Sequence, residues 1–458
     1  MGRRLLHAAL TAALLGWMLV PAGGAAAKVV ARGLPDTFLA HVLGSPAERA
    51  EAFDALMSVR RLQELVSVPK NLVQFHVFGT VDTPTVVGGA DGWLFFRDQF
   101  EDGKCPPDPD PLVEAANAAA TARAVAELVG VRLLWAVAPD KSVVHPERLG
   151  ARATALAPCN QRVAYLFRSL LRRLAAEAVD HLEVLAREPD GPQYYWATGT
   201  HWNRIGYLRA AWQLRRALDP EAGPLEIAAA GGGTEERETD LSRLVLGSPL
   251  TEAGPLAPHE VEEAVLGTPI RGTEGAVVVH DSFLGIYPET AGLFGPGARV
   301  MNYNRLTSRQ VPTAIDPLPR LLVLSSVERL SVRRMSGEWS IDGPLLRPLK
   351  DAYLAASRRA CGDATPLAVA AAPRETAPSG EPAYLVEVAP GVTCLNLDLT
   401  RPEAERWRVW WPPLEGQEAG ATFEPGRWIA LPPGQGPESA PLLLPAGVAG
   451  RAVLFEPL

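Results

Sequence analysis

Short apolar runs alternate with longer helical stretches from residue 80 to residue 355, and this alternation limits the possible folds more than any other feature. Each apolar run is bounded by turn-forming or polar residues, as buried strands are. The expected strands are 93–96, 133–138, 276–280 and 321–324. Alanine, leucine and arginine recur at helical spacing in 111–128, 161–178 and 204–218. The pattern predicts an α/β fold in which helices flank a sheet.

The chain has 458 residues, more than the roughly 250–300 at which a single hydrophobic core stops growing, so we expect two folded domains. Proline, glycine and alanine dominate 362–382, which is typical of a linker. Short strand-like runs with proline-rich turns follow and favour a small C-terminal β-sandwich. The predicted parts are a leader at 1–27, a helical extension at 28–79, the α/β domain at 80–358, a linker at 359–382 and a β-rich domain at 383–458.

Four tryptophans gather in the expected β-rich domain: Trp407, Trp410, Trp411 and Trp428. Exposed indole rings stack well on sugars, so this domain is a candidate for carbohydrate binding. The alternative is that the indoles fill the core of the sandwich. Trp410 and Trp411 are adjacent and would point to opposite faces of a strand, which keeps both interpretations open.

The N-terminus has the features of an export signal. Arg3 and Arg4 precede an apolar run, and small residues follow near Ala27, where we expect cleavage. The alternative is an uncleaved anchor, but the run is shorter than the roughly 20 residues that span a bilayer. We therefore expect a periplasmic or secreted protein. Its net charge of −8 becomes more negative after cleavage, which argues against a nucleic-acid partner.

The chain has four cysteines, and an oxidising compartment favours disulfides over free thiols. Proximity in sequence pairs Cys105 with Cys159 and Cys361 with Cys394. Four cysteines allow three connectivities, so the sequence gives a preference among them. The alternative is four buried free thiols.

Two segments contain residues suited to acyl transfer. Ser282 follows a strand-like run, as a nucleophile would, and His201 lies in the segment 194–203 and could be its base. Each residue also has a structural interpretation. Asp281 and Ser282 could cap a helix, and His201 could donate to a backbone carbonyl. His280 precedes Ser282 by two residues, but the turn after the strand should separate them, so His201 is the better candidate.

Four segments together resemble the alginate O-acetyltransferase family of the AlgX/AlgJ type, whose catalytic domain is SGNH-hydrolase-like. They are 88–96, 138–147 with Pro139-Asp140-Lys141, 194–206 with Thr200-His201-Trp202-Asn203, and 277–283. The resemblance covers roughly 58–330. It implies that Ser282 is the nucleophile and His201 the base, and it places histidine before serine, as here. It also implies an acetyl donor outside the cytoplasm, supplied by a membrane-bound partner.

The sequence departs from this family at Gly199, where the family has the aspartate that orients the histidine. Glycine can neither orient an imidazole nor offset its charge. Three explanations are open: another acid such as Asp190 or Asp140 contacts the imidazole, a backbone carbonyl orients it, or the domain has lost catalysis. Trp202, Lys141 and Arg204 are candidate substrate-binding residues, because cations can hold the carboxylates of an anionic polysaccharide.

The eight histidines are dispersed, and neither Cys-x-x-Cys nor His-Glu-x-x-His occurs, so we expect no metal. A phosphate-binding loop is also missing from the sequence, and we expect no cofactor. The leading hypothesis is an exported O-acetyltransferase acting on hydroxyls of an exopolysaccharide. The alternatives are a carbohydrate acetyl esterase, or a non-catalytic polysaccharide-binding or assembly protein. The sequence does not identify the glycan.

Overall fold

The computed structural model describes residues 83–101, 110–174, 178–185, 193–225 and 233–361, with isolated residues before residue 83 and short stretches between 367 and 457. The leader at 1–27 and most of the extension at 28–79 lie outside these residues, so both stay predictions. Among the helices described, none is long and apolar enough to cross a membrane.

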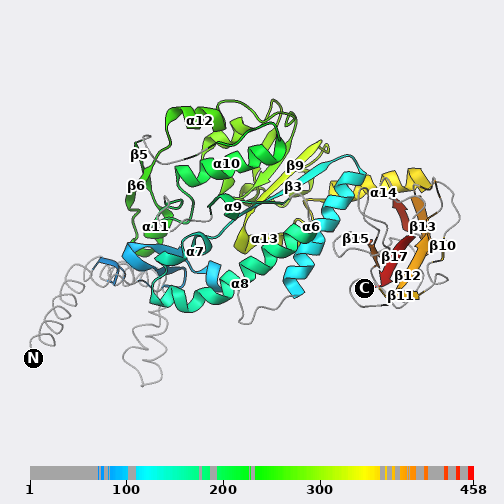
Figure 1. Ribbon diagram of the computed structural model, residues 1–458, viewed down its shortest axis with the longest axis horizontal. Coiled ribbons are helices and arrows are strands. Elements are labelled where there is room, and N and C mark those ends of the chain that lie inside the picture. The colour runs from blue at the N-terminus through cyan, green and yellow to red at the C-terminus, as the bar shows by residue number, and fades with distance from the viewer. Residues whose placement is uncertain are drawn as a thin grey trace, which may run out of the picture.

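A five-stranded parallel sheet forms the centre of the α/β domain, which confirms the predicted sheet flanked by helices (Figure 1). Its spatial order is β4, β3, β9, β7, β8, and every neighbouring pair is parallel. The strands are β3 (Arg132–Ala138), β4 (Ala178–Asp180), β7 (Val277–His280), β8 (Arg299–Asn302) and β9 (Leu321–Val327). Because all five run the same way, the segments that leave their carboxyl ends gather along one edge of the sheet.

Helices cover both faces of this sheet, and the strand residues alternate between two apolar clusters. Trp135 and Val137 of β3 face one cluster with α6, whereas Leu134 and Ala136 face the other with α10. Such alternation is what the pleat of a strand imposes. The longer helices are α6 (Asp110–Leu128), α8 (Ala151–Leu174), α10 (Arg204–Leu218), α13 (Glu328–Ser336) and α14 (Arg347–Cys361).

The remaining elements of this domain are short. The helices are α5 (Asp98–Glu101), α7 (Lys141–Val144), α9 (Leu182–Leu185), α11 (Asp240–Leu246) and α12 (His259–Leu266). Two antiparallel hairpins are β1 (Val86–Gly88) with β2 (Leu94–Phe96), and β5 (Thr234–Glu238) with β6 (Thr251–Pro255). The 3-10 turns are η1 (Ala90–Gly92), η2 (Pro146–Arg148), η3 (Leu284–Ile286), η4 (Pro288–Leu293), η5 (Tyr303–Arg305) and η6 (Val311–Thr313).

Three details differ from the sequence-based expectation. The strand expected at 93–96 pairs with β1 and lies outside the central sheet. The helix expected at 161–178 begins earlier, at Ala151, and ends at Leu174. Its predicted last residue, Ala178, instead begins β4, because three residues of strand give too short a pattern to recognise.

The C-terminal part contains only strands among its described residues, in two sheets ordered β10-β13-β16 and β11-β12-β17-β14-β15. They are β10 (Leu367–Ala368), β11 (Arg374–Thr376), β12 (Pro382–Glu387), β13 (Cys394–Asp398), β14 (Trp407–Trp410), β15 (Trp428–Leu431), β16 (Ala440–Leu443) and β17 (Ala452–Pro457). β10 and β11 fall within the expected linker. The sandwich packing and the exposure of the tryptophan side chains stay predictions, since the described residues do not include them.

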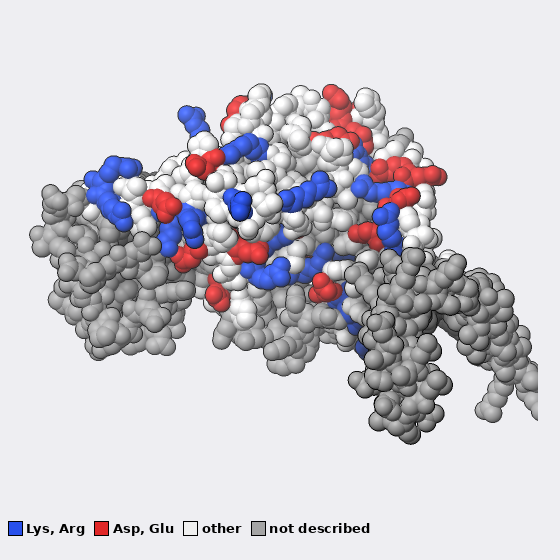
Figure 2. All heavy atoms as spheres, turned by 180° about the vertical axis from the view of Figure 1, so that it is seen from behind, with Lys and Arg blue, Asp and Glu red and all other residues white. Residues whose placement is uncertain are grey.

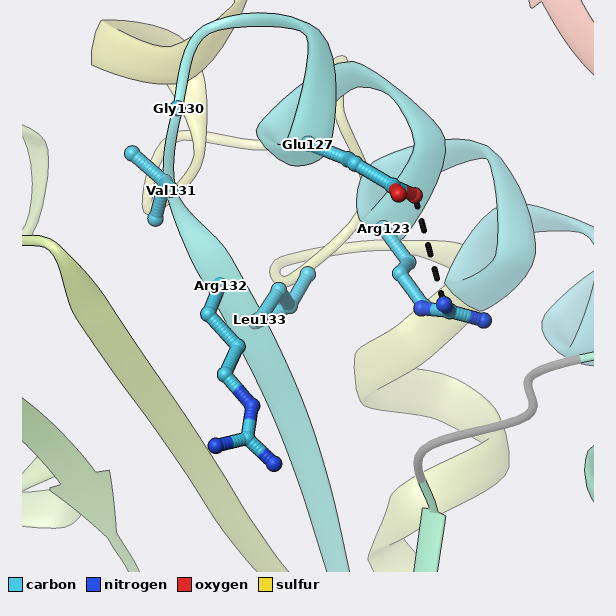
Figure 3. A pocket seen from close by; sticks show the side chains of 6 residues that line it. All are labelled: Arg123, Glu127, Gly130, Val131, Arg132 and Leu133. Atoms are coloured by element: carbon cyan, nitrogen blue, oxygen red, sulfur yellow. Dashed lines mark ion pairs between the residues drawn. The ribbon is translucent and has the colours of Figure 1, made fainter. Parts of the chain in front are cut away.

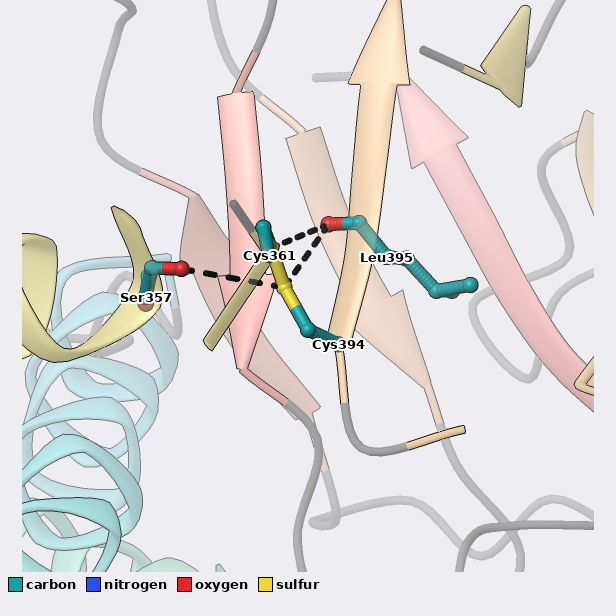
Figure 4. The surroundings of a disulfide bond; sticks show 4 residues. All are labelled: Ser357, Cys361, Cys394 and Leu395. Atoms are coloured by element: carbon teal, nitrogen blue, oxygen red, sulfur yellow. Dashed lines mark hydrogen bonds between the residues drawn. A yellow bond between two sulfur atoms is a disulfide. The ribbon is translucent and has the colours of Figure 1, made fainter. Parts of the chain in front are cut away.

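The predicted disulfide between Cys361 and Cys394 is confirmed and joins the end of α14 to β13 (Figure 4). The carbonyl oxygens of Ser357 and Leu395 lie beside its sulfur atoms. The other predicted pair includes Cys105, which lies outside the described residues, so the Cys105–Cys159 pairing stays a prediction.

Candidate active site

The carboxyl edge of the sheet brings together the segments that the sequence singled out. Asp140 follows β3, Ser282 follows β7, and Glu328 follows β9. These strands are neighbours in the order β3, β9, β7, so the three segments meet at the same edge. This is where ligands bind in open α/β sheets.

The segment 194–203 folds back on itself and presents His201. Tyr195 and Trp202 form an isolated antiparallel bridge, and the Trp196 amide donates to the His201 carbonyl at 3.2 Å. The side chain of Asn203 then caps α10 by accepting from the Gly206 amide at 3.1 Å. The bridge and the cap fix the two ends of the histidine loop, residues 196–201.

A buried lysine holds the carbonyls of the histidine loop. The Lys141 ammonium donates to the carbonyl oxygens of Trp196 at 3.1 Å, Ala197 at 3.0 Å and Gly199 at 2.6 Å. The side chain is 2% exposed. Burial lowers the pKa of Lys141 to about 7, although the negative charges of Glu252 and Asp240 oppose the shift. Three carbonyl oxygens around one ammonium tie its α7 segment to the loop.

A carboxylate holds the amides of the same loop from β6. Glu252 accepts from the backbone amides of Ala197 at 2.7 Å and Thr198 at 3.0 Å, and from the Thr198 hydroxyl at 3.1 Å. The positive charge of Lys141 therefore binds carbonyl oxygens of the loop, and the negative charge of Glu252 binds its backbone amides. The position of His201 is set by residues that lie far from it in sequence.

The turn that carries Ser282 is equally well fixed. Asp281 accepts from the Phe283 amide at 2.9 Å with Oδ1 and from the Val327 amide at 2.6 Å with Oδ2. Arg334 pairs with the same carboxylate at 3.4 Å. Asp281 therefore holds the turn after β7 against the end of β9, and it does not cap the 3-10 turn that follows. Ser282 itself is half-buried at the end of β7.

The turn and the histidine loop meet through an aromatic contact. The ring centroids of His201 and Phe283 lie 4.9 Å apart, which places the imidazole beside the residue that follows Ser282. The His201 Nε2 atom is buried and has no hydrogen-bond partner among the described residues. Such an unpaired nitrogen is what a general base offers to a hydroxyl.

The other nitrogen of the ring faces a carboxylate that the sequence did not indicate. His201 Nδ1 lies 3.5 Å from Oδ2 of Asp240, the first residue of α11. Burial would raise the pKa of this carboxyl, but the hydrogen bond and charge of His201 and the Thr200 amide hold it well below its usual range. Nothing in the sequence relates position 240 to position 201, since the two meet only through the tertiary fold.

Neither acid suggested by the sequence takes this position. Asp140 is fully buried and pairs with Arg329, whose backbone amide also donates to it at 3.2 Å. Asp190 lies outside the described residues. Position 199 is a glycine, and the carboxylate that the structure shows beside the imidazole is that of Asp240.

A buried ion cluster supports the edge of the sheet below the site. Arg168 of α8 donates to Asp180 at 2.9 Å and to Glu328 at 2.7 Å and 3.1 Å. Burial raises the pKa of Glu328 above its ordinary range, although Arg168 opposes the shift and Asp140 adds to it. The cluster fixes the ends of β4 and β9 relative to α8.

The three expected substrate-binding residues are not on the surface. Trp202 is fully buried against Phe283. Lys141 directs its ammonium at the histidine loop. Arg204 is 8% exposed and pairs with Glu262 at 2.8 Å and Glu289 at 3.3 Å. All three side chains already have internal contacts, and substrate binding by these residues stays a prediction.

His280 is also accounted for by internal contacts. Its Nδ1 donates to the Asp281 carbonyl at 2.6 Å, and burial lowers its pKa. A Cβ atom on Gly285 would come within 2.2 Å of the His280 ring, so the ring is packed against that backbone. This agrees with the choice of His201 over His280 as the base.

A hollow elsewhere on the domain lies at the other end of the sheet (Figure 3). It is lined by Arg123, Glu127, Gly130, Val131, Arg132 and Leu133. These residues surround the amino end of β3, whereas Asp140 follows its carboxyl end. The hollow is therefore separate from the candidate site. Within the described part of the chain, no cluster of three potential ligands could hold a metal ion.

Comparison with known proteins agrees with this architecture. Residues 86–269 match the family model described as the SGNH hydrolase-like domain of the acetyltransferase AlgX. The matched residues include His201 and Asp240 and end before Ser282. A curated relative, the probable alginate O-acetylase AlgJ of Pseudomonas aeruginosa, is 29% identical over 210 residues. That alignment covers 44% of this chain and 47% of the relative, so the chain spans about half the length of the curated relative.

Two solved structures are also similar. The O-acetyltransferase domain of Pseudomonas putida AlgJ has a TM-score of 0.36 and 19% identity, covering 55% of this chain and 99% of that one. AlgX of Pseudomonas aeruginosa has a TM-score of 0.35 and 13% identity, covering 83% and 94%. Residues 86–269 are therefore similar to the AlgX/AlgJ family of SGNH hydrolase-like acetyltransferase domains.

Proposed function

We propose that this protein is an exported O-acetyltransferase that modifies hydroxyl groups of an exopolysaccharide through an acyl-enzyme on Ser282, with His201 as the base. The observation that carries the proposal is the unpaired, buried Nε2 of His201 beside the Ser282–Phe283 turn. That nitrogen is free to take a proton from a hydroxyl placed beside it.

The chemistry has two half-reactions. In the first, the Ser282 Oγ attacks the acetyl carbonyl of the donor, its proton passes to His201 Nε2, and the donor's leaving group departs with that proton. In the second, a sugar hydroxyl attacks the acetyl-serine, gives its proton to Nε2, and Ser282 recovers a proton as it leaves. Both half-reactions need a neutral imidazole at the start.

The surroundings of Ser282 suit the charge that develops on the carbonyl oxygen. Asp281 binds the Phe283 and Val327 amides, so both of its carboxylate oxygens already have internal partners. We propose that the Ser282 amide is one oxyanion donor, because the backbone at a nucleophile commonly fills that role.

The substrate class rests on the family and on the relative's name. The curated relative is named as a probable alginate O-acetylase, so a polysaccharide is the acceptor that we propose here. On the face that Figure 2 shows, acidic and basic side chains of the described residues are interspersed. The predicted leader puts the reaction outside the cytoplasm, with acetyl groups supplied by a membrane-bound partner.

The test is an acetyl-transfer assay with the purified protein. A chromogenic acetyl ester serves as donor, and an oligosaccharide or water serves as acceptor. We expect an acetyl adduct on Ser282 by intact mass and peptide mapping, and transfer to the oligosaccharide. Ser282→Ala should lower turnover by at least about 10³-fold, whereas Ser336→Ala, a matched change in α13, should leave it unchanged.

Each other outcome selects an alternative. Acetyl release to water with none to any saccharide would make the protein a carbohydrate esterase. Turnover that survives Ser282→Ala would reject the acyl-enzyme. If no adduct forms with any acetyl donor, a non-catalytic polysaccharide-binding or assembly role becomes the better explanation.

A further inference from the structure

Gly199 lies close to the carboxylate of Asp240. An ideal Cβ at this position would lie 3.4 Å from Asp240 Oδ1 and 3.0 Å from the Trp196 Cβ. A side chain at 199 would therefore grow toward the carboxylate of Asp240. The backbone of Gly199 is not in the left-handed region, so glycine is not required there by its φ angle.

The carboxylate of Asp240 is held in a defined orientation. Its Oδ1 accepts from the Thr200 amide at 2.7 Å and from the Leu241 amide at 3.0 Å. These bonds leave Oδ2 directed at His201 Nδ1, 3.5 Å away. Thr200 is the residue immediately before His201, so the carboxylate binds both the backbone of the loop and the ring that the loop carries.

The element that carries Asp240 is fixed to the histidine loop by further contacts. The hydroxyls of Thr198 and Thr239 lie 2.7 Å apart, and the Ser242 amide donates to the Thr198 carbonyl at 3.1 Å. Thr239 and Ser242 flank Asp240 in sequence. The start of α11 and the loop therefore move as one unit, and the distance between Asp240 and His201 is set by hydrogen bonds on both sides of the acid.

We propose that Asp240 is the positioning residue for His201 and takes the place of the acid that is missing at Gly199. This inference rests on the proposed function. A carboxylate at Nδ1 keeps the proton on that nitrogen, leaves the lone pair on Nε2 for Ser282, and stabilises the imidazolium that forms when Ser282 attacks.

The magnitude follows from the geometry. Replacing the acid of a serine-protease triad by its amide lowers turnover by about 10⁴. Asp240 is 48% exposed, so water screens its charge and its contact with Nδ1 is at the long end of the hydrogen-bond range. We therefore expect Asp240→Asn to lower kcat by about 10²–10³-fold, with KM changed by less than about threefold.

The position of the acid is tested by moving it. Asp240→Ala removes the carboxylate and makes room beside Gly199, and the double variant Asp240→Ala/Gly199→Asp returns a carboxylate from the loop itself. We expect the double variant to recover at least about tenfold in kcat over Asp240→Ala. Asp342→Asn is a matched control, because Asp342 is 43% exposed, pairs with Lys350, and lies between α13 and α14.

A measurement without turnover completes the test. In protein labelled with ¹⁵N-histidine, and with Ser282→Ala to silence chemistry, NMR reports which ring nitrogen of His201 carries the proton. We expect the Nδ1–H tautomer in this background and its loss when Asp240→Asn is added. An Nε2–H tautomer with Asp240 present would overturn the inference, even in a protein that shows no activity.

The two proposals fail separately. If Ser282→Ala retains turnover, the acyl-enzyme is rejected and the tautomer measurement alone decides the role of Asp240. If Ser282→Ala abolishes turnover but Asp240→Asn keeps kcat within threefold of the native value, Asp240 does not position the base, and the proposed function stands without it.

Discussion

Lys141→Met should destabilise the protein and disable the candidate site together. The ammonium of Lys141 is buried and donates to the carbonyls of Trp196, Ala197 and Gly199. Methionine has a similar length but no donor, so the change leaves three carbonyl oxygens without their partner. The histidine loop would then be held mainly from the other side, by Glu252.

The size of the effect follows from two opposing contributions. A buried carbonyl left without a donor costs about 1–3 kcal/mol, and the change removes the donor of three carbonyl oxygens. Removing a buried ammonium returns part of this, since burial lowers the pKa of Lys141 from 10.5 to about 7. The three carbonyls amount to about 3–9 kcal/mol and the offset to about 5 kcal/mol, so we expect the free energy of unfolding to fall by up to about 4 kcal/mol at pH 6, where Lys141 is charged.

Urea denaturation followed by tryptophan fluorescence measures this directly, and the acetyl-ester assay reads the site in the same samples. Lys350→Met is the matched control, because Lys350 is more exposed and pairs with Asp342 at the surface. Its loss should cost no more than about 1 kcal/mol. If Lys141→Met unfolds at the same urea concentration as the native protein, the carbonyls find other donors and Lys141 does not hold the loop.

Three further predictions concern the same framework. Burial lowers the pKa of Lys141 to about 7 in the folded protein, whereas the unfolded chain keeps this proton up to about pH 10.5. The free energy of unfolding should therefore rise with pH between these values, by roughly 1 kcal/mol per pH unit. Lys141→Met should flatten that rise in urea melts recorded at several pH values. Glu252→Gln should lower stability by about 1–2 kcal/mol and reduce kcat, because an amide has one acceptor oxygen for the four donors that Glu252 binds; equal melting curves would contradict this. Cys361→Ser/Cys394→Ser opens a link spanning 33 residues and should cost about 3 kcal/mol in thermal melts, while acetyl transfer at 25 °C stays native; loss of transfer with an unchanged melt would refute it.

The fold was predictable where one segment carries a complete local signal. The helix expected at 204–218 is found with the same bounds, because Asn203 caps its start and its apolar residues recur on one face. The apolar run at 93–96 is a strand, but its sequence does not encode its partner. It pairs with Val86–Gly88 instead of joining the sheet, since register and pairing are properties of the tertiary structure.

The sequence predicted the residues of the candidate site that lie in recognisable motifs, but it did not predict the residues that hold them in place. His201 and Ser282 lie in segments that resemble a family, so their pairing could be proposed from sequence. Asp240 begins the short helix α11 and Glu252 lies in the strand β6 that follows it, and nothing in their sequence context distinguishes these carboxylates from those of surface residues. Only the fold shows that both point at the histidine loop.

The glycine at position 199 illustrates why an acid can be absent from a motif while its physical role is kept. What the imidazole requires is a carboxylate within reach of Nδ1, and that requirement concerns a position in space. The amides of Thr200 and Leu241 orient Asp240 from α11, and its Oδ2 lies 3.5 Å from His201 Nδ1. A carboxylate that is distant in sequence therefore offers the imidazole the same contact that an acid at 199 would offer, so the motif can lose its acid while the ring keeps a carboxylate neighbour.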